Sequence, residues 1–262
     1  FDTASGYSDS EEKIGYALAD RRDEFYIATK CSGAKDRAEV ISLAERSLER
    51  LQTDHLDLLQ LHNPKSVPDP DDPESIYTGL VEARERGLTR FIGITNHSRE
   101  VALKAVETGF FDTLQFPLSA ISSAEDFELA DRCAELDVGF IAMKALWGGL
   151  LRDARLAFAG LRSREHVVPI WGIQRISELE ELLELEEHPP VLTPEIEAEI
   201  AKETEALSGD FCRACGYCLP CPVDIPIPMA ARIGLLLHRM PSERFREPDW
   251  QERLARVDEC IE

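Results

Sequence analysis

Residues 56–62 read LDLLQLH, a short apolar run that ends in a histidine, His62. Similar runs recur along the first two thirds of the chain, and segments with helical periodicity lie between them. The other runs are FYIATK (25–30), RFIGITN (90–96), TLQFPL (113–118), GFIAMKAL (139–146) and VVPIWG (167–172), together with FDT (1–3) as the end of a further strand. Strands that are apolar nearly throughout and alternate with helices indicate a parallel sheet buried on both faces.

The segments between the runs have the spacing of amphipathic helices. In residues 38–51 (AEVISLAERSLERL), four apolar side chains recur at helical spacing and form one face. They are Ile41, Ala44, Leu48 and Leu51. Ser8 and Glu11 are spaced as a capping box, which predicts that a helix begins there.

Seven strand ends in succession favour a (β/α)8 TIM barrel over a doubly wound sheet. No G-x-G-x-x-G motif follows any of the runs, which also speaks against a Rossmann domain. The eighth strand and its helix would precede Phe1, so we expect the chain to lack the first strand and helix of the barrel. The barrel is expected to comprise residues 1–207.

Four polar residues lie at or just beyond predicted strand ends, where the active sites of such barrels are found. They are Asp2, Tyr7, Lys30 and His62. A tyrosine hydroxyl is a weak acid at neutral pH, and a neighbouring cation stabilises the phenolate and lowers its pKa. We therefore predict that Tyr7 is a general acid beside Lys30, which Asp2 orients. His62 would then hydrogen-bond the carbonyl oxygen that Tyr7 protonates.

A dense cysteine run, CRACGYCLPCP, occupies residues 212–222. C-x-x-C-x-x-C spacing, with a proline after the last cysteine, is typical of bacterial-type iron–sulfur sites. Zinc sites usually space their cysteine pairs further apart, and disulfides between cysteines this close would be strained. The run therefore favours an iron–sulfur cluster, with zinc or reduced structural thiols as the alternatives. The predicted ligands are Cys212, Cys215, Cys218 and Cys221.

The composition argues against several classes of partner. A formal charge of −21 opposes binding to nucleic acid or to an anionic membrane. No apolar run is long enough to cross a bilayer, and a hydrophobic content of 44% suits a globular protein with a sizeable core. We expect a reduced, cytoplasmic protein with no nucleic-acid or membrane partner.

Residues 1–207 resemble the aldo-keto reductase family. The resemblance rests on FDTASGYSDSE (1–11), ATK (28–30), LLQLHNP (58–64), FIGITNHS (91–98) and GGLL (148–151). It implies hydride transfer from NADPH or NADH to a small aldehyde or ketone, with Tyr7 as general acid. It implies that Asp2, Lys30 and His62 complete a catalytic tetrad. It also implies cofactor-binding residues: Thr95, Asn96 and Gln115 for the nicotinamide, and Gly148, Gly149 and Leu150 for the pyrophosphate.

Two features depart from the family's pattern. Met143 stands where the family commonly has an aromatic residue stacked on the nicotinamide. The tract GIQRISELEELLELEE (172–187) is where the family's NADPH-preferring members carry basic residues for the 2′-phosphate. Its only basic residue here is Arg175. Because the acids that follow it would repel a 2′-phosphate, NADH and NADPH both stay open.

Residues 208–262 resemble the ferredoxin-like tail found on one branch of the family. Thr193 and Pro194 predict the start of the last helix before this extension. The resemblance implies 4Fe-4S clusters, two of them in the full-length protein. Cys260 would then be the first ligand of a second motif, or else an ordinary cysteine near a helix end. Of the other cysteines, Cys31 is a candidate to face substrate, whereas Cys133 is expected in the core.

Two functions are therefore consistent with the sequence. The favoured one is a nicotinamide-dependent carbonyl reductase fused to an iron–sulfur module. The alternative is an electron-transfer or partner-docking protein that uses a catalytically idle barrel as a scaffold. Nicotinamide delivers two electrons as hydride, whereas a cubane accepts one, and no flavin fingerprint is visible. We therefore expect the cluster to be structural or to serve an outside redox partner.

Overall fold

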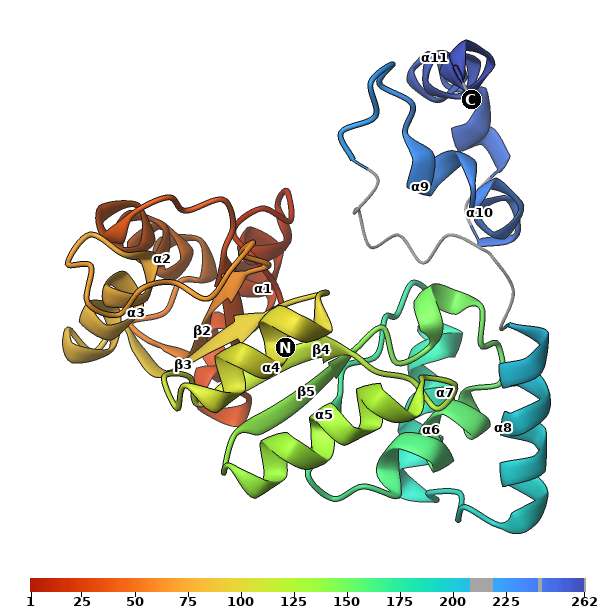
Figure 1. Ribbon diagram of the computed structural model, residues 1–262, viewed down its shortest axis with the longest axis horizontal. Coiled ribbons are helices and arrows are strands. Elements are labelled where there is room, and N and C mark those ends of the chain that lie inside the picture. The colour runs from red at the N-terminus through yellow and green to blue at the C-terminus, as the bar shows by residue number, and fades with distance from the viewer. Residues whose placement is uncertain (208–218, 240–241, 262) are drawn as a thin grey trace. The chain divides into compact units, whose positions relative to one another are not determined.

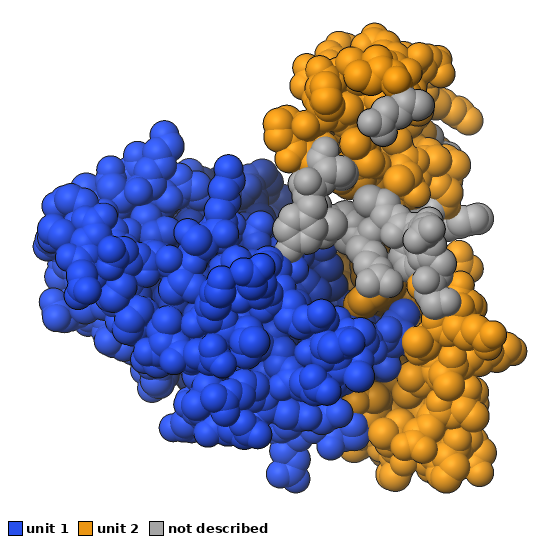
Figure 2. All heavy atoms as spheres, viewed as in Figure 1, with its two compact units in different colours: residues 1–145, 161–171 blue, residues 146–160, 172–262 orange. Residues whose placement is uncertain are grey.

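The computed structural model describes residues 1–207, 219–239 and 242–261. The chain divides into two compact units (Figure 2). The first comprises residues 1–145 and 161–171, and the second comprises residues 146–160 and the described part of 172–262. The four predicted catalytic residues all lie in the first unit.

A six-stranded parallel sheet forms the centre of the first unit (Figure 1). Its strands are β1 (Ala28–Cys31), β2 (Leu56–His62), β3 (Thr89–Thr95), β4 (Thr113–Pro117), β5 (Gly139–Met143) and β6 (Val167–Pro169). Each strand pairs in parallel with the next one along the chain, which confirms the predicted parallel sheet. The segment FDT does not form the expected strand end. It contributes a single parallel bridge, between Asp2 and Ala28, at the β1 edge of the sheet.

Helices alternate with the strands. In the first unit they are α1 (Ser10–Leu18), η1 (Ala19–Glu24), α2 (Arg37–Leu51), α3 (Ile76–Glu85), α4 (Arg99–Glu107) and α5 (Ala124–Glu135). Helix α6 (Ala154–Arg162) has residues in both units. In the second unit they are η2 (Trp147–Gly149), α7 (Ile176–Glu187), α8 (Pro194–Ala206), α9 (Ile227–Ala230), α10 (Ile233–Arg239), η3 (Ser242–Arg246), α11 (Pro248–Ala255) and η4 (Arg256–Glu259). None of the helices in the described ranges has both the length and the apolar character needed to cross a membrane.

The predicted apolar face of α2 is buried against the sheet. Ile41, Ala44 and Leu51 are buried, and Leu48 is half-buried against the same core. The Asp36 side chain caps the helix by accepting a hydrogen bond from the Glu39 backbone N–H at 2.8 Å. Because α2 follows β1, burial of this face holds the strand that carries Lys30.

The predicted capping box of Ser8 and Glu11 is wrong. Helix α1 has Asp9 as its N-cap residue, whose side chain forms no capping hydrogen bond, and Ser8 has a positive φ of 42°. The Glu11 side chain is instead buried, where it accepts a 2.6 Å hydrogen bond from Thr29 Oγ1 in β1. A tertiary contact with the strand has taken the carboxylate that the local pattern assigned to the helix end.

Both cysteines of the first unit are core residues. Cys133 in α5 is buried as predicted. Cys31 is only 3% exposed and belongs to the same apolar cluster, so the expectation that it could face substrate is wrong. Burial raises the pKa of each thiol to about 12, which keeps both protonated and unreactive at neutral pH.

Helix α8 begins as the sequence predicts. Thr193 is its N-cap residue and accepts a hydrogen bond from the Ile196 backbone N–H, with Pro194 in the first turn. The helix ends at Ala206. The predicted boundary at residue 208 falls on the first residue outside the described part, so it stays a prediction.

Candidate active site

Asp2 and Lys30 form a buried ion pair at the edge of the sheet. The two side chains come together because the segment after Phe1 lies alongside β1, through the bridge from Asp2 to Ala28. Lys30 Nζ donates hydrogen bonds to Asp2 Oδ2 at 2.7 Å and to the Thr3 carbonyl oxygen at 2.6 Å. The Lys30 side chain is only 1% exposed, so these two oxygens replace most of its hydration.

The charge on Lys30 depends on this pair. Burial lowers the pKa of Lys30, and the carboxylate of Asp2 acts in the opposite direction through its charge and its hydrogen bond. The second oxygen of that carboxylate, Asp2 Oδ1, is buried and has no hydrogen-bond partner among the described residues. The pair therefore holds a cation in a dry site, where a charge interacts strongly with its neighbours.

Tyr7 and His62 lie next to this pair. The loop after Asp2 places the Tyr7 ring centroid 5.1 Å from Lys30 Nζ and 5.6 Å from the ring of His62, with the two rings nearly perpendicular. His62 is at the end of β2, which pairs with β1. The structure thus brings together all four residues predicted from the sequence.

The pKa of Tyr7 is shifted in the direction opposite to our prediction. Burial raises it, and the negative charge of Asp2 raises it further. Asp2 lies against Lys30 and offsets the charge that was expected to stabilise the phenolate. Tyr7 therefore stays protonated at neutral pH, which is the state that a proton donor requires.

His62 is held in its neutral form. Burial lowers its pKa, and the positive charge of Lys30 lowers it further, while Asp2 acts in the opposite direction. Ser32, two residues after Lys30, has its Oγ atom 2.6 Å from His62 Nδ1. Ser32 was not predicted from the sequence, where its only signal was its position two residues after Lys30.

A second histidine, His97, was also missed. Burial lowers its pKa to about 4, with contributions from Lys144 and His62. It follows β3 in the motif FIGITNHS, beside the residues assigned to the nicotinamide. His97 is therefore a neutral polar group near the rim, and its place in that motif was the available signal.

Two of the residues predicted to bind the nicotinamide form hydrogen bonds with the backbone of neighbouring loops. Thr95, at the end of β3, accepts a 3.1 Å hydrogen bond from the Asn63 backbone N–H through Oγ1. Asn96 donates to the Pro64 carbonyl oxygen at 2.8 Å and accepts from the Ser98 backbone N–H at 2.7 Å. Both side chains thus hold the loops that follow β2 and β3.

The third predicted nicotinamide residue, Gln115 in β4, is linked to the ion pair. Its Oε1 accepts from Gln60 Nε2 at 2.8 Å, and its Nε2 donates to Asp2 Oδ2 at 3.5 Å. Gln60 Oε1 is buried without a hydrogen-bond partner among the described residues. Gln60 was missed because it lies inside the run LDLLQL, which was interpreted only as a buried strand. The hydrogen bond between Gln60 and Gln115 links the polar side chains of β2 to those of β4.

The residues predicted to bind phosphate lie in the second unit. Gly148 and Gly149 have positive φ values of 63° and 87°, a backbone conformation that glycine adopts without strain. The N–H groups of Gly149 and Leu150 hydrogen-bond to carbonyl oxygens of the preceding turn, at 2.7 and 3.5 Å. Arg232 Nη2 donates to the Gly148 carbonyl oxygen at 2.9 Å, so a cation that was not predicted lies beside this loop. Arg175 is an exposed N-cap residue of α7.

The comparisons with known proteins identify the family. A family model described as "Aldo/keto reductase family" matches residues 1–183. The chain belongs to the aldo/keto reductase family. Curated relatives include the methylglyoxal reductase DkgB of Salmonella typhi, 39% identical over 127 residues that make up 45% of this chain and 46% of that protein. Another is the aldo-keto reductase AKR2E4 of Bombyx mori, 27% identical over 154 residues, which cover 54% of this chain and 50% of that protein.

Solved structures of aldo/keto reductases show the fold. An aldo-keto reductase from Klebsiella pneumoniae, crystallised in complex with NADPH, superposes with a TM-score of 0.65 over 77% of this chain and 78% of that chain, at 24% identity. This likeness confirms a (β/α)8 barrel-like fold. The chain spans about half the length of the curated relatives it matches.

The family model does not cover the cysteine run of this aldo/keto reductase, because the match ends at residue 183. Cys212, Cys215 and Cys218 lie outside the described residues. Cys221 is half-buried and Cys260 is exposed, and neither forms a disulfide. Among the residues that the structure describes, no group of three or more histidine, cysteine or acidic side chains could hold a metal ion.

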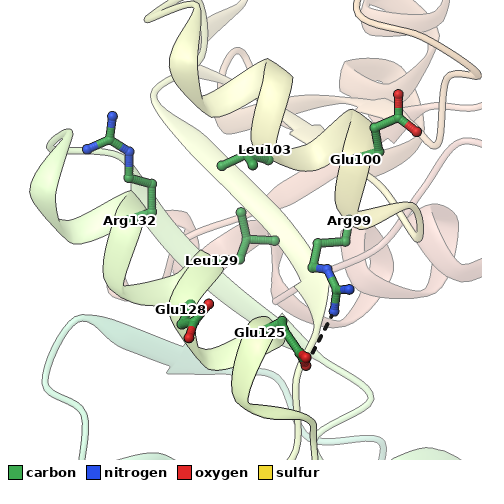
Figure 3. A pocket seen from close by; sticks show the side chains of 7 residues that line it. All are labelled: Arg99, Glu100, Leu103, Glu125, Glu128, Leu129 and Arg132. Atoms are coloured by element: carbon green, nitrogen blue, oxygen red, sulfur yellow. Dashed lines mark ion pairs between the residues drawn. The ribbon is translucent and has the colours of Figure 1, made fainter.

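A surface groove of about 560 Å³ lies between α4 and α5 (Figure 3). Its lining consists of Arg99, Glu100, Leu103, Glu125, Glu128, Leu129 and Arg132. Arg99 and Glu125 form an ion pair at 3.8 Å. None of the lining residues belongs to the tetrad, so this groove is separate from the candidate active site.

Proposed function

We propose that this protein is a nicotinamide-dependent oxidoreductase that reduces a small aldehyde or ketone. The observation that carries the proposal is the Asp2–Lys30 ion pair beside Tyr7, whose ring also lies 5.6 Å from the ring of His62. The tyrosine is protonated and the imidazole is neutral at pH 7, because burial shifts their two pKa values in opposite directions. These are the states in which both groups can donate a hydrogen bond to a carbonyl oxygen.

In this proposal Tyr7 is the general acid. As negative charge develops on the carbonyl oxygen, the hydroxyl of Tyr7 gives its proton to that oxygen and becomes a phenolate. Lys30 is the cation beside the Tyr7 ring, with Nζ 5.1 Å from the ring centroid, and the charge of its partner Asp2 reduces its effect on the phenolate. His62 orients the carbonyl oxygen by donating from Nε2, and Tyr7 then recovers a proton from solvent.

The cofactor would supply a hydride to the carbonyl carbon. The atoms at this site fit such a partner in part: the Tyr7 hydroxyl and His62 Nε2 have no hydrogen-bond partner among the described residues, and Tyr7 is 46% exposed. We propose that Thr95, Asn96 and Gln115 border the nicotinamide. In the structure all three side chains also form hydrogen bonds within the protein.

Gly148, Gly149, Leu150 and Arg175 are proposed for the phosphates. Support comes from the positive φ values of the two glycines and from the Arg232 guanidinium beside them. The acidic helix α7 leaves NADH and NADPH both open. A relative from Papaver somniferum is called an NADPH-dependent codeinone reductase, and it is 32% identical over 130 residues. This supports testing NADPH first.

The test is the variant Tyr7→Phe in the full-length protein. It should lower carbonyl-dependent oxidation of NADPH or NADH by about 10²- to 10⁴-fold, the contribution typical of general acid catalysis. Methylglyoxal is a suitable first substrate, since a relative carries it in its name. Tyr16→Phe is the matched control, because Tyr16 is 88% exposed and lies away from the tetrad on α1. Equal activity of Tyr7→Phe and the wild type would overturn the proposal.

We further propose an iron–sulfur module in residues 208–262, following a barrel at residues 1–207. The support is the spacing of Cys212, Cys215, Cys218 and Cys221, with Cys260 as an additional ligand. A cluster here would be structural or would serve a redox partner protein. Iron and acid-labile sulfide should co-purify anaerobically with the protein and be lost from a variant with serine at the first three positions. Stoichiometric zinc without sulfide would overturn this assignment.

The alternative function, a docking or electron-transfer protein with an idle barrel, rests on the same cysteine run. The ordered tetrad favours the enzyme. A fluorescence titration that shows no binding of NADPH or NADH to the wild type would favour the scaffold. A cytoplasmic location accords with the reduced cysteines and stays a proposal.

A further inference from the structure

Ser32 connects the loop that carries Tyr7 with the ring of His62. Its hydroxyl oxygen accepts a 3.2 Å hydrogen bond from the Gly6 backbone N–H and lies 2.6 Å from His62 Nδ1. The Ser32 backbone is itself fixed, because its N–H donates to Ser5 Oγ at 3.0 Å. Ser5 Oγ donates in turn to the Lys30 carbonyl oxygen at 2.9 Å. One short segment thus ties β1, the Tyr7 loop and β2 together.

The direction of the hydrogen bond between Ser32 and His62 follows from the partners available. A serine hydroxyl has one proton to donate, and Gly6 N–H can only donate, so it cannot receive that proton. Among the described residues, His62 Nδ1 is the only acceptor that the Ser32 hydroxyl contacts. Donation of the hydroxyl proton to Nδ1 satisfies both groups, and it requires Nδ1 to be unprotonated.

We propose that Ser32 is a positioning residue that fixes His62 in the tautomer protonated on Nε2 and holds the Tyr7 loop against it. The inference rests on the proposed function, in which Nε2–H is the donor to the carbonyl oxygen. It adds a residue to that site whose hydroxyl contacts neither reactant. Without it the two tautomers of a neutral imidazole would compete, and one of them has no proton on Nε2.

The packing at Gly6 supports this role. A Cβ atom added to Gly6 would lie 2.9 Å from both the Cβ and the Oγ of Ser32, closer than side chains tolerate. The loop therefore approaches Ser32 so tightly that only glycine fits beside the hydroxyl. This close approach keeps the backbone just before Tyr7 against the hydroxyl that contacts the imidazole.

Three variants of Ser32 distinguish the effect of the hydroxyl group from the effect of side-chain size. Ser32→Ala removes the hydroxyl, Ser32→Thr keeps it, and Ser32→Val has the shape of threonine without a hydroxyl. The first measurement is ¹⁵N–¹H NMR of the His62 ring in full-length protein without cofactor, with His62→Gln to assign the signals. We expect the Nε2-protonated tautomer in the wild type and in Ser32→Thr, and a mixture of tautomers in the other two. This readout does not depend on activity.

The second measurement is kinetic. In Ser32→Ala and Ser32→Val, kcat/KM for the carbonyl should fall about ten- to a hundredfold, as for other groups that orient a catalytic side chain, while the Kd for the nicotinamide cofactor stays within twofold. Ser32→Thr should recover most of that loss. If Ser32→Thr does not fold, which circular dichroism reports, Ser32→Ala carries the test through the tautomer signal.

The outcomes separate the positioning role from the proposed function. A wild-type His62 protonated on Nδ1, or tautomers unchanged in Ser32→Ala, would overturn the role of Ser32 whatever the activity. A shifted tautomer in Ser32→Ala would support it, even if no carbonyl were reduced by the wild type. In that last case only the proposed function would fail.

Discussion

Replacing Asp2 with asparagine should reduce the free energy of unfolding by about 3–5 kcal/mol at pH 7, the range found when one partner of a buried ion pair is removed. Lys30 is 1% exposed and its Nζ lies 2.7 Å from Asp2 Oδ2, so water cannot take the place of the carboxylate. The Thr3 carbonyl oxygen stays within 2.6 Å, but it carries no net charge. The variant therefore leaves a cation in the core without its counter-ion.

This loss depends on pH, because Lys30 can become neutral by releasing its proton. For an ordinary lysine pKa of about 10.4, release at pH 7 costs about 4.6 kcal/mol, and the cost falls by about 1.4 kcal/mol per pH unit. At pH 9.5 deprotonation of Lys30 costs only about 1.2 kcal/mol, so the loss of unfolding free energy in Asp2→Asn cannot exceed about that value. Burial lowers the pKa of folded Lys30, more so without Asp2, so the unfolded state binds more protons between the two pKa values. Stability of the variant then rises with pH through that window.

Urea unfolding at pH 7 and pH 9.5 measures the effect. The four proteins are the wild type, Asp2→Asn, Lys30→Met and the double variant. We expect the deficit of Asp2→Asn to shrink to about 1 kcal/mol at pH 9.5, and the double variant to be more stable than the sum of the single losses predicts. A deficit of equal size at both pH values, or additivity within about 0.5 kcal/mol, would refute the electrostatic reasoning.

Three further predictions concern the pH profile, a buried thiol and a helix cap. Burial lowers the pKa of His62 and raises that of Tyr7, so kcat/KM for carbonyl reduction should be flat between pH 7 and pH 9; a titration inside that range would contradict these states. Cys31, with its pKa raised to about 12 by burial, should escape iodoacetamide at pH 8 in the folded protein and react after unfolding, as mass spectrometry would show; modification of folded protein would contradict its burial. Thr193→Ala should lower the unfolding free energy of α8 by about 1 kcal/mol, with Thr193→Ser as the control that keeps the cap; equal thermal stability of the two variants would show that the cap is not used.

Much of the fold could be predicted from local patterns. The apolar runs became the strands of the sheet because a strand buried on both faces needs apolar side chains throughout, whichever protein carries it. The run at residues 56–62 forms β2 without a change of boundary. Lys30 and His62 could be placed at one edge of the sheet because parallel strands present their carboxyl ends on the same side.

Other features could not be predicted, because they depend on pairs that are distant in the sequence. Thr29 and Glu11 are 18 residues apart, and their hydrogen bond moved Glu11 from a predicted helix cap into the core. Gln60 and Gln115 are 55 residues apart, and neither carries a local signal for the other. Cys31 follows a rim residue in the sequence, but the alternation of side chains along β1 turns it into the core.

The sequence by itself indicated the parallel α/β architecture through its periodicity and the family through its motifs, because both are local properties of the chain. It also proposed Asp2, Tyr7, Lys30 and His62 as one set of site residues. The tertiary structure decided the protonation states and the supporting contacts. Burial raises the pKa of Tyr7 where the nearby lysine alone predicted a lower one, since desolvation and the charge of Asp2 are set by the surroundings and not by the motif. The tertiary structure also brought Ser32 to the ring of His62, 30 residues away in the chain, because β1 pairs with β2.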